Sequence, residues 1–486
     1  MDLTKLFPLF DGGTGIAVLA LYAVVVLGLT YAFSRGYNKN KEGYLVAKRE
    51  IGGWAGAASI GAAWVWAPAM YVSAQQAYQN GIAGLFWFTI GNFLTLILFS
   101  FFAKKVREKK PDGFTISGFI KEKFSTRVQN IFLIELFVLA VCSFATNVLA
   151  GSKSVEILTG IPTIATSIAL AALALAYSIP NGLKASVVTE IFKIVMLWTG
   201  LFILVPWAIS AGGGFDTVAA GLGGITGNGT NPFVGDFALG VFLGFGASTF
   251  LGHLGAPWGD NSFWTRAFAV KANKVQAAFI GGALLFVVIP LLAGMLGFLA
   301  AGLGYDIPKQ LVGYTNIVTL ASLLPSWSLL LFLFIAFAGL VGVLDSQLSS
   351  AANLVGSDLY DKYAKDLGVS PILWSRIGMV ALAIAGLVLA NWPGMTIQTI
   401  FVFFGVMRAT VWIPTMLSIW KPNLITEKGM FWGISTAYVV GMPIFLYGQF
   451  GGGNNYTFAG TLIGIFGSGI LATLISSVDN KKVVTA

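Results

Sequence analysis

Charged residues are scarce in this sequence of 486 amino acids, where Asp, Glu, Lys and Arg together make up only 10%. Soluble globular proteins carry about 25%. Hydrophobic residues make up 56%, and the mean hydropathy is +0.81. The apolar runs are about 20 residues long and continuous, which fits spanning helices and not the short alternating strands of a membrane barrel. We therefore predict an all-α polytopic membrane protein.

Cysteine and histidine are almost absent. The single cysteine, Cys142, excludes an intrachain disulfide, and no Cys/His cluster with metal-ligand spacing is present. The sequence also lacks a Ser/His/Asp grouping and a phosphate-binding Gly-Lys loop. Residues 1–9 lack the basic start and cleavage site of a signal peptide. These absences argue against an enzyme, a membrane hydrolase or a primary pump.

Thirteen apolar segments divide the chain. They lie near residues 13–34, 52–78, 82–103, 128–150, 161–180, 183–209, 236–256, 275–301, 327–350, 371–391, 396–419, 430–449 and 456–477.

Basic residues set the expected orientation of these segments. With the N-terminus outside, 24 of the 29 Lys and Arg residues fall in cytoplasmic loops or at their flanks. The positive-inside rule therefore places the N-terminus outside and the C-terminus in the cytoplasm of a plasma or inner cell membrane. This distribution also explains the net charge of +9 without a nucleic-acid partner, so the expected partners are the lipid bilayer and a small molecule. The oligomeric state is left open. The remaining basic residues are Lys5, Lys153 and Lys309 outside, and Lys193 and Arg408 within spans.

Two of the segments carry helix-breaking residues. Pro68 lies in the middle of the second segment, among small residues, and proline removes a helix hydrogen bond. The stretch 240–262 in the seventh segment is rich in glycine and contains a proline and the only histidine, His253, which disfavours a continuous α-helix. Interrupted spans mark the binding site in many transporters, although a simple kink at Pro68 is equally consistent.

The two interrupted spans are five spans apart, which is the arrangement of an inverted five-helix repeat. We predict one transmembrane transporter domain over residues 1–486. Its expected parts are a leading helix and cytoplasmic loop (1–50), a first repeat (51–210), a second repeat (236–420) and two trailing helices (428–486).

Five charged residues fall inside spans, where burying a charge costs free energy and therefore indicates a functional role. One of them, Glu135, lies about two turns in from the cytoplasmic end of the fourth span. Asp345, with Ser346 beside it, is predicted to serve an ion, a proton or a substrate, the alternative being a helix-packing face. Arg408, about twelve residues into its span, would either pair with Asp345 or grip an anionic substrate. Glu190 and Lys193, three residues apart, are predicted to form a salt bridge.

These features favour a secondary active transporter for a small polar organic solute. The alternative is an uncoupled facilitator or a transporter-like sensor. Aromatic side chains would shape the pocket, and amides and a guanidinium would orient the solute. The candidate substrate-binding residues are Trp64, Trp66, Ala69, Gln75, Gln76, His253 and Arg408.

Three stretches carry a resemblance to a known family: 48–54 before the broken second span, 181–190 at the start of the sixth span, and 345–360 in and after the ninth. Together they resemble the sodium/solute symporters of the solute carrier 5 type. The resemblance implies a LeuT-type 5+5 inverted repeat, with about thirteen helices here, and cation-coupled uptake by alternating access. Further stretches resemble the urea active transporter branch, which favours urea or another small amide, whereas Arg408 favours an anion or an amino acid. These stretches are 64–66, 75–78, 84–87, 258–264 and 405–414.

The resemblance also implies a sodium site, and the sequence departs from it. The family uses backbone carbonyls that match Ala62 and Val65, a carbonyl on the ninth span, and two adjacent hydroxyls. Those two hydroxyl positions are Gly342 and Val343 here, which carry none. We expect Asp345 to carry the coupling, either by completing a rebuilt sodium shell or by taking a proton, unless coupling is lost. The candidate cation ligands are Ala62, Val65, Gly342, Asp345 and Ser346.

Overall fold

Helices make up nearly all of the structure, a computed structural model that describes residues 7–33 and 40–484. Lys5, predicted to lie outside, falls outside the described residues. Within the described ranges, twelve helices are long and apolar enough to cross a membrane. The α-helical segments are α1 (Gly12–Phe33), α2 (Lys41–Val46), α3 (Gly53–Trp64), α4 (Ala67–Lys109), α5 (Ile116–Lys123), α6 (Thr126–Thr159), α7 (Thr163–Asn181), α8 (Leu183–Ala211), α9 (Phe215–Ala220), α10 (Asp236–Val241), α11 (Ala247–Gly255), α12 (Asn261–Ala269), α13 (Val275–Gly302), α14 (Thr315–Leu323), α15 (Trp327–Asn353), α16 (Pro371–Ala390), α17 (Ile397–Ala409), α18 (Trp412–Trp420), α19 (Glu427–Thr436), α20 (Met442–Tyr447), α21 (Asn454–Leu462) and α22 (Ser468–Val484).

The helix α4 contains the third predicted segment and the second part of the second one. Its backbone turns at Gly81, which has φ +60° and ψ −148°. The indole Nε1 of Trp64 donates to the carbonyl of Asn92, 3.1 Å away, a contact between residues 28 positions apart that a straight helix would keep about 40 Å apart. The chain therefore doubles back at Gly81. The second predicted segment consists of α3 and the first arm of α4, and the third is the second arm of α4. Thirteen predicted segments therefore correspond to twelve long apolar helices among the described residues.

The predicted break in the second span lies at Val65 and Trp66, between α3 and α4. Pro68 sits in the first turn of α4, where the missing N–H costs no helix hydrogen bond. The side chain of Asn147, on α6, accepts a hydrogen bond from the Ala67 N–H at 2.9 Å and so caps α4. Side chains from other helices thus satisfy the backbone groups that the break exposes, as a membrane interior requires.

The glycine-rich seventh span stays helical, which differs from the expected interruption. Residues 242–246 form a π-helical turn and 256–259 a tight 3₁₀ turn, and the chain leaves the helix at Asp260. Glycines here serve close packing instead: a Cβ on Gly252 would lie 2.9 Å from the backbone of Gly405, so α11 and α17 approach closely.

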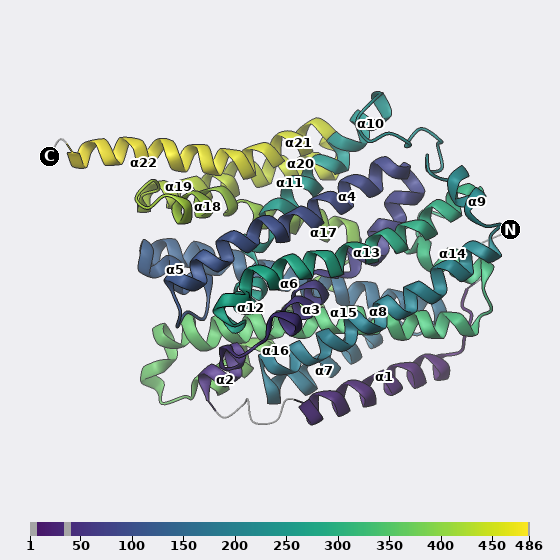
Figure 1. The fold of residues 1–486 in the computed structure, drawn as a ribbon, viewed down its shortest axis with the longest axis horizontal. Coiled ribbons are helices and arrows are strands. Elements are labelled where there is room, and N and C mark those ends of the chain that lie inside the picture. The colour runs from purple at the N-terminus through teal and green to yellow at the C-terminus, as the bar shows by residue number, and fades with distance from the viewer. Residues whose placement is uncertain (1–6, 34–39, 485–486) are drawn as a thin grey trace.

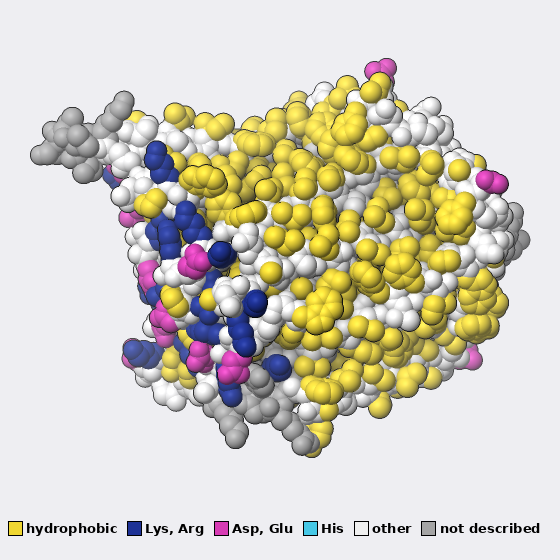
Figure 2. Space-filling model, in the orientation of Figure 1, with side chains coloured by type: hydrophobic (Ala, Val, Ile, Leu, Met, Phe, Trp, Pro, Cys, Tyr) yellow, Lys and Arg dark blue, Asp and Glu magenta, His cyan; other side chains and the backbone are white. Residues whose placement is uncertain are grey.

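The long helices run roughly along one axis of the molecule, with the two termini at opposite ends (Figure 1). Figure 2 shows an apolar middle zone and a gathering of Lys and Arg at the end that carries α5 and the C-terminus. Exposed residues such as Ile16, Leu21 and Val24 on α1 form part of this apolar surface. The all-helical membrane fold expected from the sequence is confirmed.

Candidate functional site

A small cavity lies beside the break between α3 and α4. Its lining is aromatic with a few polar groups, the composition of a pocket for a small solute. The lining residues are Trp64, Trp66, Pro68, Ala69, Phe88, Asn92, His253, Phe401 and Arg408. Five of the seven predicted substrate-binding residues are therefore brought together here, from three separate parts of the chain.

Among the residues that the structure describes, Arg408 is the one cation that lines this cavity, and its side chain is fully buried. Its guanidinium lies 4.6 Å from the ring centre of Trp66 and 5.3 Å from that of Trp64, a cation–π arrangement. Its Nε and Nη1 groups have no hydrogen-bond partner. Unpaired buried donors cost free energy, so an acceptor that entered the cavity and met them would be stabilised.

Two carboxyl groups balance the charge of Arg408 without forming an ion pair with it. Glu135 on α6 and Asp260 both act on the guanidinium electrostatically. A Cβ on Gly259 would lie 2.8 Å from Glu135 Oε1 and 2.9 Å from the Cβ of Arg408. Both oxygens of Glu135 and Oδ2 of Asp260 lack hydrogen-bond partners. A single ionised carboxylate at either position is enough to cancel the charge of the guanidinium.

His253 completes one wall of the cavity. Its Nδ1 is hydrogen-bonded to the carbonyl of Thr249 one turn earlier on α11, which makes Nε2 the acceptor of the neutral ring. Its ring centre lies 5.1 Å from that of Phe401 and 6.2 Å from that of Trp64. The close approach of α11 and α17 at Gly252 brings this histidine and Arg408 to the same cavity.

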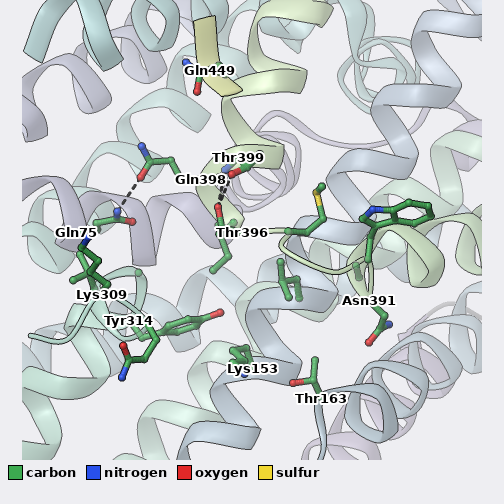
Figure 3. Close-up of a pocket in the computed structure, with 18 of the residues that line it drawn as sticks. Gln75, Lys153, Thr163, Lys309, Tyr314, Asn391, Thr396, Gln398, Thr399 and Gln449 are labelled. Atoms are coloured by element: carbon green, nitrogen blue, oxygen red, sulfur yellow. Dashed lines mark hydrogen bonds between the residues drawn. The ribbon is translucent and has the colours of Figure 1, made fainter. Parts of the chain in front are cut away.

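The cavity is closed, and a larger vestibule lies toward one end of the molecule. The cavity has a volume of about 10 Å³, room for about one water molecule. The vestibule has a volume of about 730 Å³. Figure 3 shows polar side chains around it, among them Lys309, Tyr314 and Asn391. They come from loops that the basic-residue pattern places outside.

Gln75 lies in the vestibule and not in the cavity. Its Nε2 donates to Oε1 of Gln398 on α17 at 2.8 Å and to Oε1 of Gln79 at 3.1 Å (Figure 3). Gln398 is about one turn before Phe401, which lines the cavity, so the Gln75–Gln398 bond lies on the vestibule side of the cavity. Gln76 is also outside the cavity: it accepts a hydrogen bond from Asn80 and lines a different pocket.

Asp345 is held by hydroxyl groups and not by Arg408. Its carboxylate accepts hydrogen bonds from Tyr177 on α7 at 2.7 Å, and from Ser186 at 2.8 Å and Thr189 at 2.5 Å on α8. The alternative of an Asp345–Arg408 ion pair is therefore wrong.

A second prediction about ion pairs is also wrong. Glu190 pairs with Arg266 on α12 and not with Lys193, and both partners of this pair are at most 1% exposed. Ser59 and Ser346 hydrogen-bond to the same pair, which links α3, α8, α12 and α15. Arg266 is one of the 24 basic residues expected in cytoplasmic loops or at their flanks, but it is buried in α12, where it reaches Glu190.

The ammonium of Lys193 lies at the break. Its Nζ donates to the carbonyl of Val65 at 2.7 Å. The other predicted cation ligands also have protein partners: the carbonyl of Ala62 accepts from the Val65 N–H at 3.0 Å, and that of Gly342 lies 2.7 Å from Ser346 Oγ. The residues present do not fit the family's sodium site.

Several residues of the site are not among those predicted from the sequence. These residue types are common in such a protein, and only the packing of helices that are distant in the sequence brings them to the site. Glu135 is a partial exception: a carboxylate two turns inside a span is a functional candidate because burying its charge in the membrane costs free energy. The others are Asn92, Asp260, Arg266, Gln398 and Phe401.

Comparison with known proteins agrees with this architecture. The sequence model described as the sodium:solute symporter family matches residues 44–436. The urea-proton symporter DUR3 of Oryza sativa subsp. japonica is 24% identical over 90% of this chain, which spans 66% of that relative's length. The sodium/glucose cotransporter of Vibrio parahaemolyticus is 26% identical over 90% of this chain and 85% of its own.

A solved structure shows the same fold. The chain superposes on a Na⁺-coupled sialic acid symporter in a substrate-bound outward-open state with a TM-score of 0.76, at 15% identity over 96% of this chain and 98% of that one.

Proposed function

Because this chain belongs to the sodium:solute symporter family, whose members couple a solute to Na⁺ or H⁺, we propose that it imports a small polar solute by alternating access. The solute would bind in the cavity between the α3–α4 break, α11 and α17. The unpartnered donors of Arg408 in this cavity carry the proposal.

The charges around the cavity favour a neutral solute over an anion. Glu135 and Asp260 offset the guanidinium charge, so an added carboxylate would meet no excess positive charge. The donors that remain suit a carbonyl oxygen, and the rings of Trp64 and Trp66 suit a flat molecule. Urea or another small amide has both properties, and the similarity to a urea-proton symporter supports this class.

We assign the coupling to Asp345. It is a fully buried carboxylate whose hydrogen-bond donors are the neutral hydroxyls of two neighbouring helices. Carboxylates in such positions mark ion and proton pathways. The repeat boundaries 51–210 and 236–420 and the outside N-terminus belong to the same proposal. The Lys and Arg gathered at the C-terminal end support this orientation in a cell membrane.

A thermal-shift screen of the purified chain tests the proposed substrate class. A ligand that binds only the folded state raises the melting temperature. We expect urea or small amides to do so, and neutral solutes to do so more than carboxylates. A screen in which only carboxylates stabilise the protein would contradict the neutral class, and stabilisation by none of these solutes would contradict the proposal.

A further inference from the structure

Lys193 is a fully buried lysine on α8 whose ammonium lies against the broken span. Its Nζ donates to the Val65 carbonyl at 2.7 Å, one of the backbone groups that the break releases from helix hydrogen bonding. A released carbonyl inside a membrane protein needs a cation or a donor as a partner. The lysine side chain supplies both from within the chain.

Gly342 on α15 makes room for the stem of this lysine. A Cβ at position 342 would lie 3.0 Å from Cδ of Lys193, a tight contact that would require the lysine stem to shift by a few tenths of an ångström. A serine or threonine there would press into the lysine stem. The absence of a side chain at position 342 therefore leaves the space that the stem of Lys193 occupies.

The charges around Lys193 balance without an added ion. The charged and titratable groups facing it are Glu190 on its own helix, Asp345 on α15 and Arg266 on α12. Lys193 and Arg266 supply two positive charges, and Glu190 and Asp345 supply two negative ones. A sodium ion at this position would add an uncompensated charge in a site from which water is excluded.

We propose that the Lys193 ammonium is a tethered internal cation that stands where relatives would bind sodium, so that this chain binds and transports its solute independently of sodium. The inference rests on the proposed transport function, because a sodium position has meaning only in a transporter. It goes beyond that function by excluding one of the family's two coupling cations at this site.

Melting temperatures of the purified full chain test the inference without any substrate. At equal ionic strength, the wild type should melt at the same temperature in sodium chloride and in choline chloride. A saturable rise of the wild-type melting temperature with sodium would overturn the proposal. This result does not depend on any variant folding.

A double variant tests whether removal of the ammonium restores a response to sodium. Lys193→Ala with Gly342→Ser removes the ammonium and returns one hydroxyl, and a folded sample should gain a saturable sodium-dependent rise in melting temperature. The control Lys309→Ala removes a lysine of the vestibule and should stay insensitive to sodium. A folded double variant that ignores sodium would contradict the inference.

Transport separates the two proposals. Initial solute uptake by the wild type should be unchanged when choline replaces sodium. If the chain transports none of the solutes tested, the proposed function fails, whereas the melting experiments still decide the role of Lys193.

Discussion

Arg408 defines the chemistry of the candidate site at the scale of single residues. It is a buried guanidinium between aromatic rings, with two donors that no protein group accepts. Lysine keeps the charge but lacks the planar set of donors. The residue should therefore matter for solute binding beyond its charge.

Arg408→Lys should weaken solute binding by about 10- to 100-fold, since hydrogen bonds to charged groups contribute about 1.5–3 kcal/mol. Equilibrium binding of the solute identified by the screen measures this. Arg376→Lys is the matched control, because Arg376 donates to the carbonyl of Ile179 away from the cavity. Equal affinities for the two variants would remove Arg408 from the binding site.

Predictions of single residues from the sequence succeed where the free-energy cost of placing a residue inside a membrane span is high enough to indicate a function. A charge or a break inside a span is expensive, so Trp64, Trp66 and Arg408 could be selected without a structure. Pairings could not be predicted, because they depend on which helices pack together. Glu190 takes Arg266 from α12, although Lys193 is only three positions away. Gln75 and Gln76 lie too close to the Gly81 turn of α4 to reach the cavity.

At the scale of elements, α4 depends on one glycine. Gly81 has φ +60° and ψ −148°, and a Cβ there would lie 2.4 Å from the carbonyl of Leu222. Pro68 indicated an interruption or a kink in the second span, and the structure places the break at Val65 and Trp66. The seventh span remains helical despite its glycines, with a π-helical turn at 242–246. Glycine content alone does not distinguish a break from close helix packing.

Gly81→Ala should destabilise the protein by about 1–3 kcal/mol or more, through backbone strain and collision with the 210–235 loop. Gly28→Ala on α1 is the control, because a Cβ there meets nothing within 4 Å. Thermal melting in detergent compares the two. A melting temperature for Gly81→Ala equal to that of Gly28→Ala would show that the turn at position 81 is not constrained.

The Glu190–Arg266 pair links helices across the bundle, and breaking a buried pair leaves one charge uncompensated. Glu190→Gln and Arg266→Gln should each cost about 3–5 kcal/mol, and the double variant should cost less than their sum. The half-exposed pair Lys110–Glu122 should contribute at most about 1 kcal/mol. Denaturation of the single and double variants measures the free energy of unfolding for both pairs. If the losses of stability at positions 190 and 266 are additive, the two side chains do not interact directly.

At the scale of the whole molecule, the two ends differ in charge, and this difference predicts the orientation. Single cysteines at Lys121 and Thr230 report on opposite ends in a Cys142→Ser background, and both positions are exposed. An impermeant thiol reagent added outside intact cells should label Thr230→Cys and not Lys121→Cys. The reverse pattern would invert the topology.

The central claim is that this chain concentrates a small neutral solute by coupling it to a cation. The names of two relatives give a proton for one and sodium for the other. Because we propose that the Lys193 ammonium takes the place of sodium beside the Val65 carbonyl, we expect the proton to be the coupling ion. The direct measurement is solute uptake into proteoliposomes under an imposed proton gradient, a sodium gradient, or neither. The account predicts accumulation above equilibrium with the inward proton gradient alone, and Asp345→Asn should still exchange solute without concentrating it. Accumulation driven by sodium, full accumulation by Asp345→Asn, or uptake that never exceeds equilibrium would contradict it.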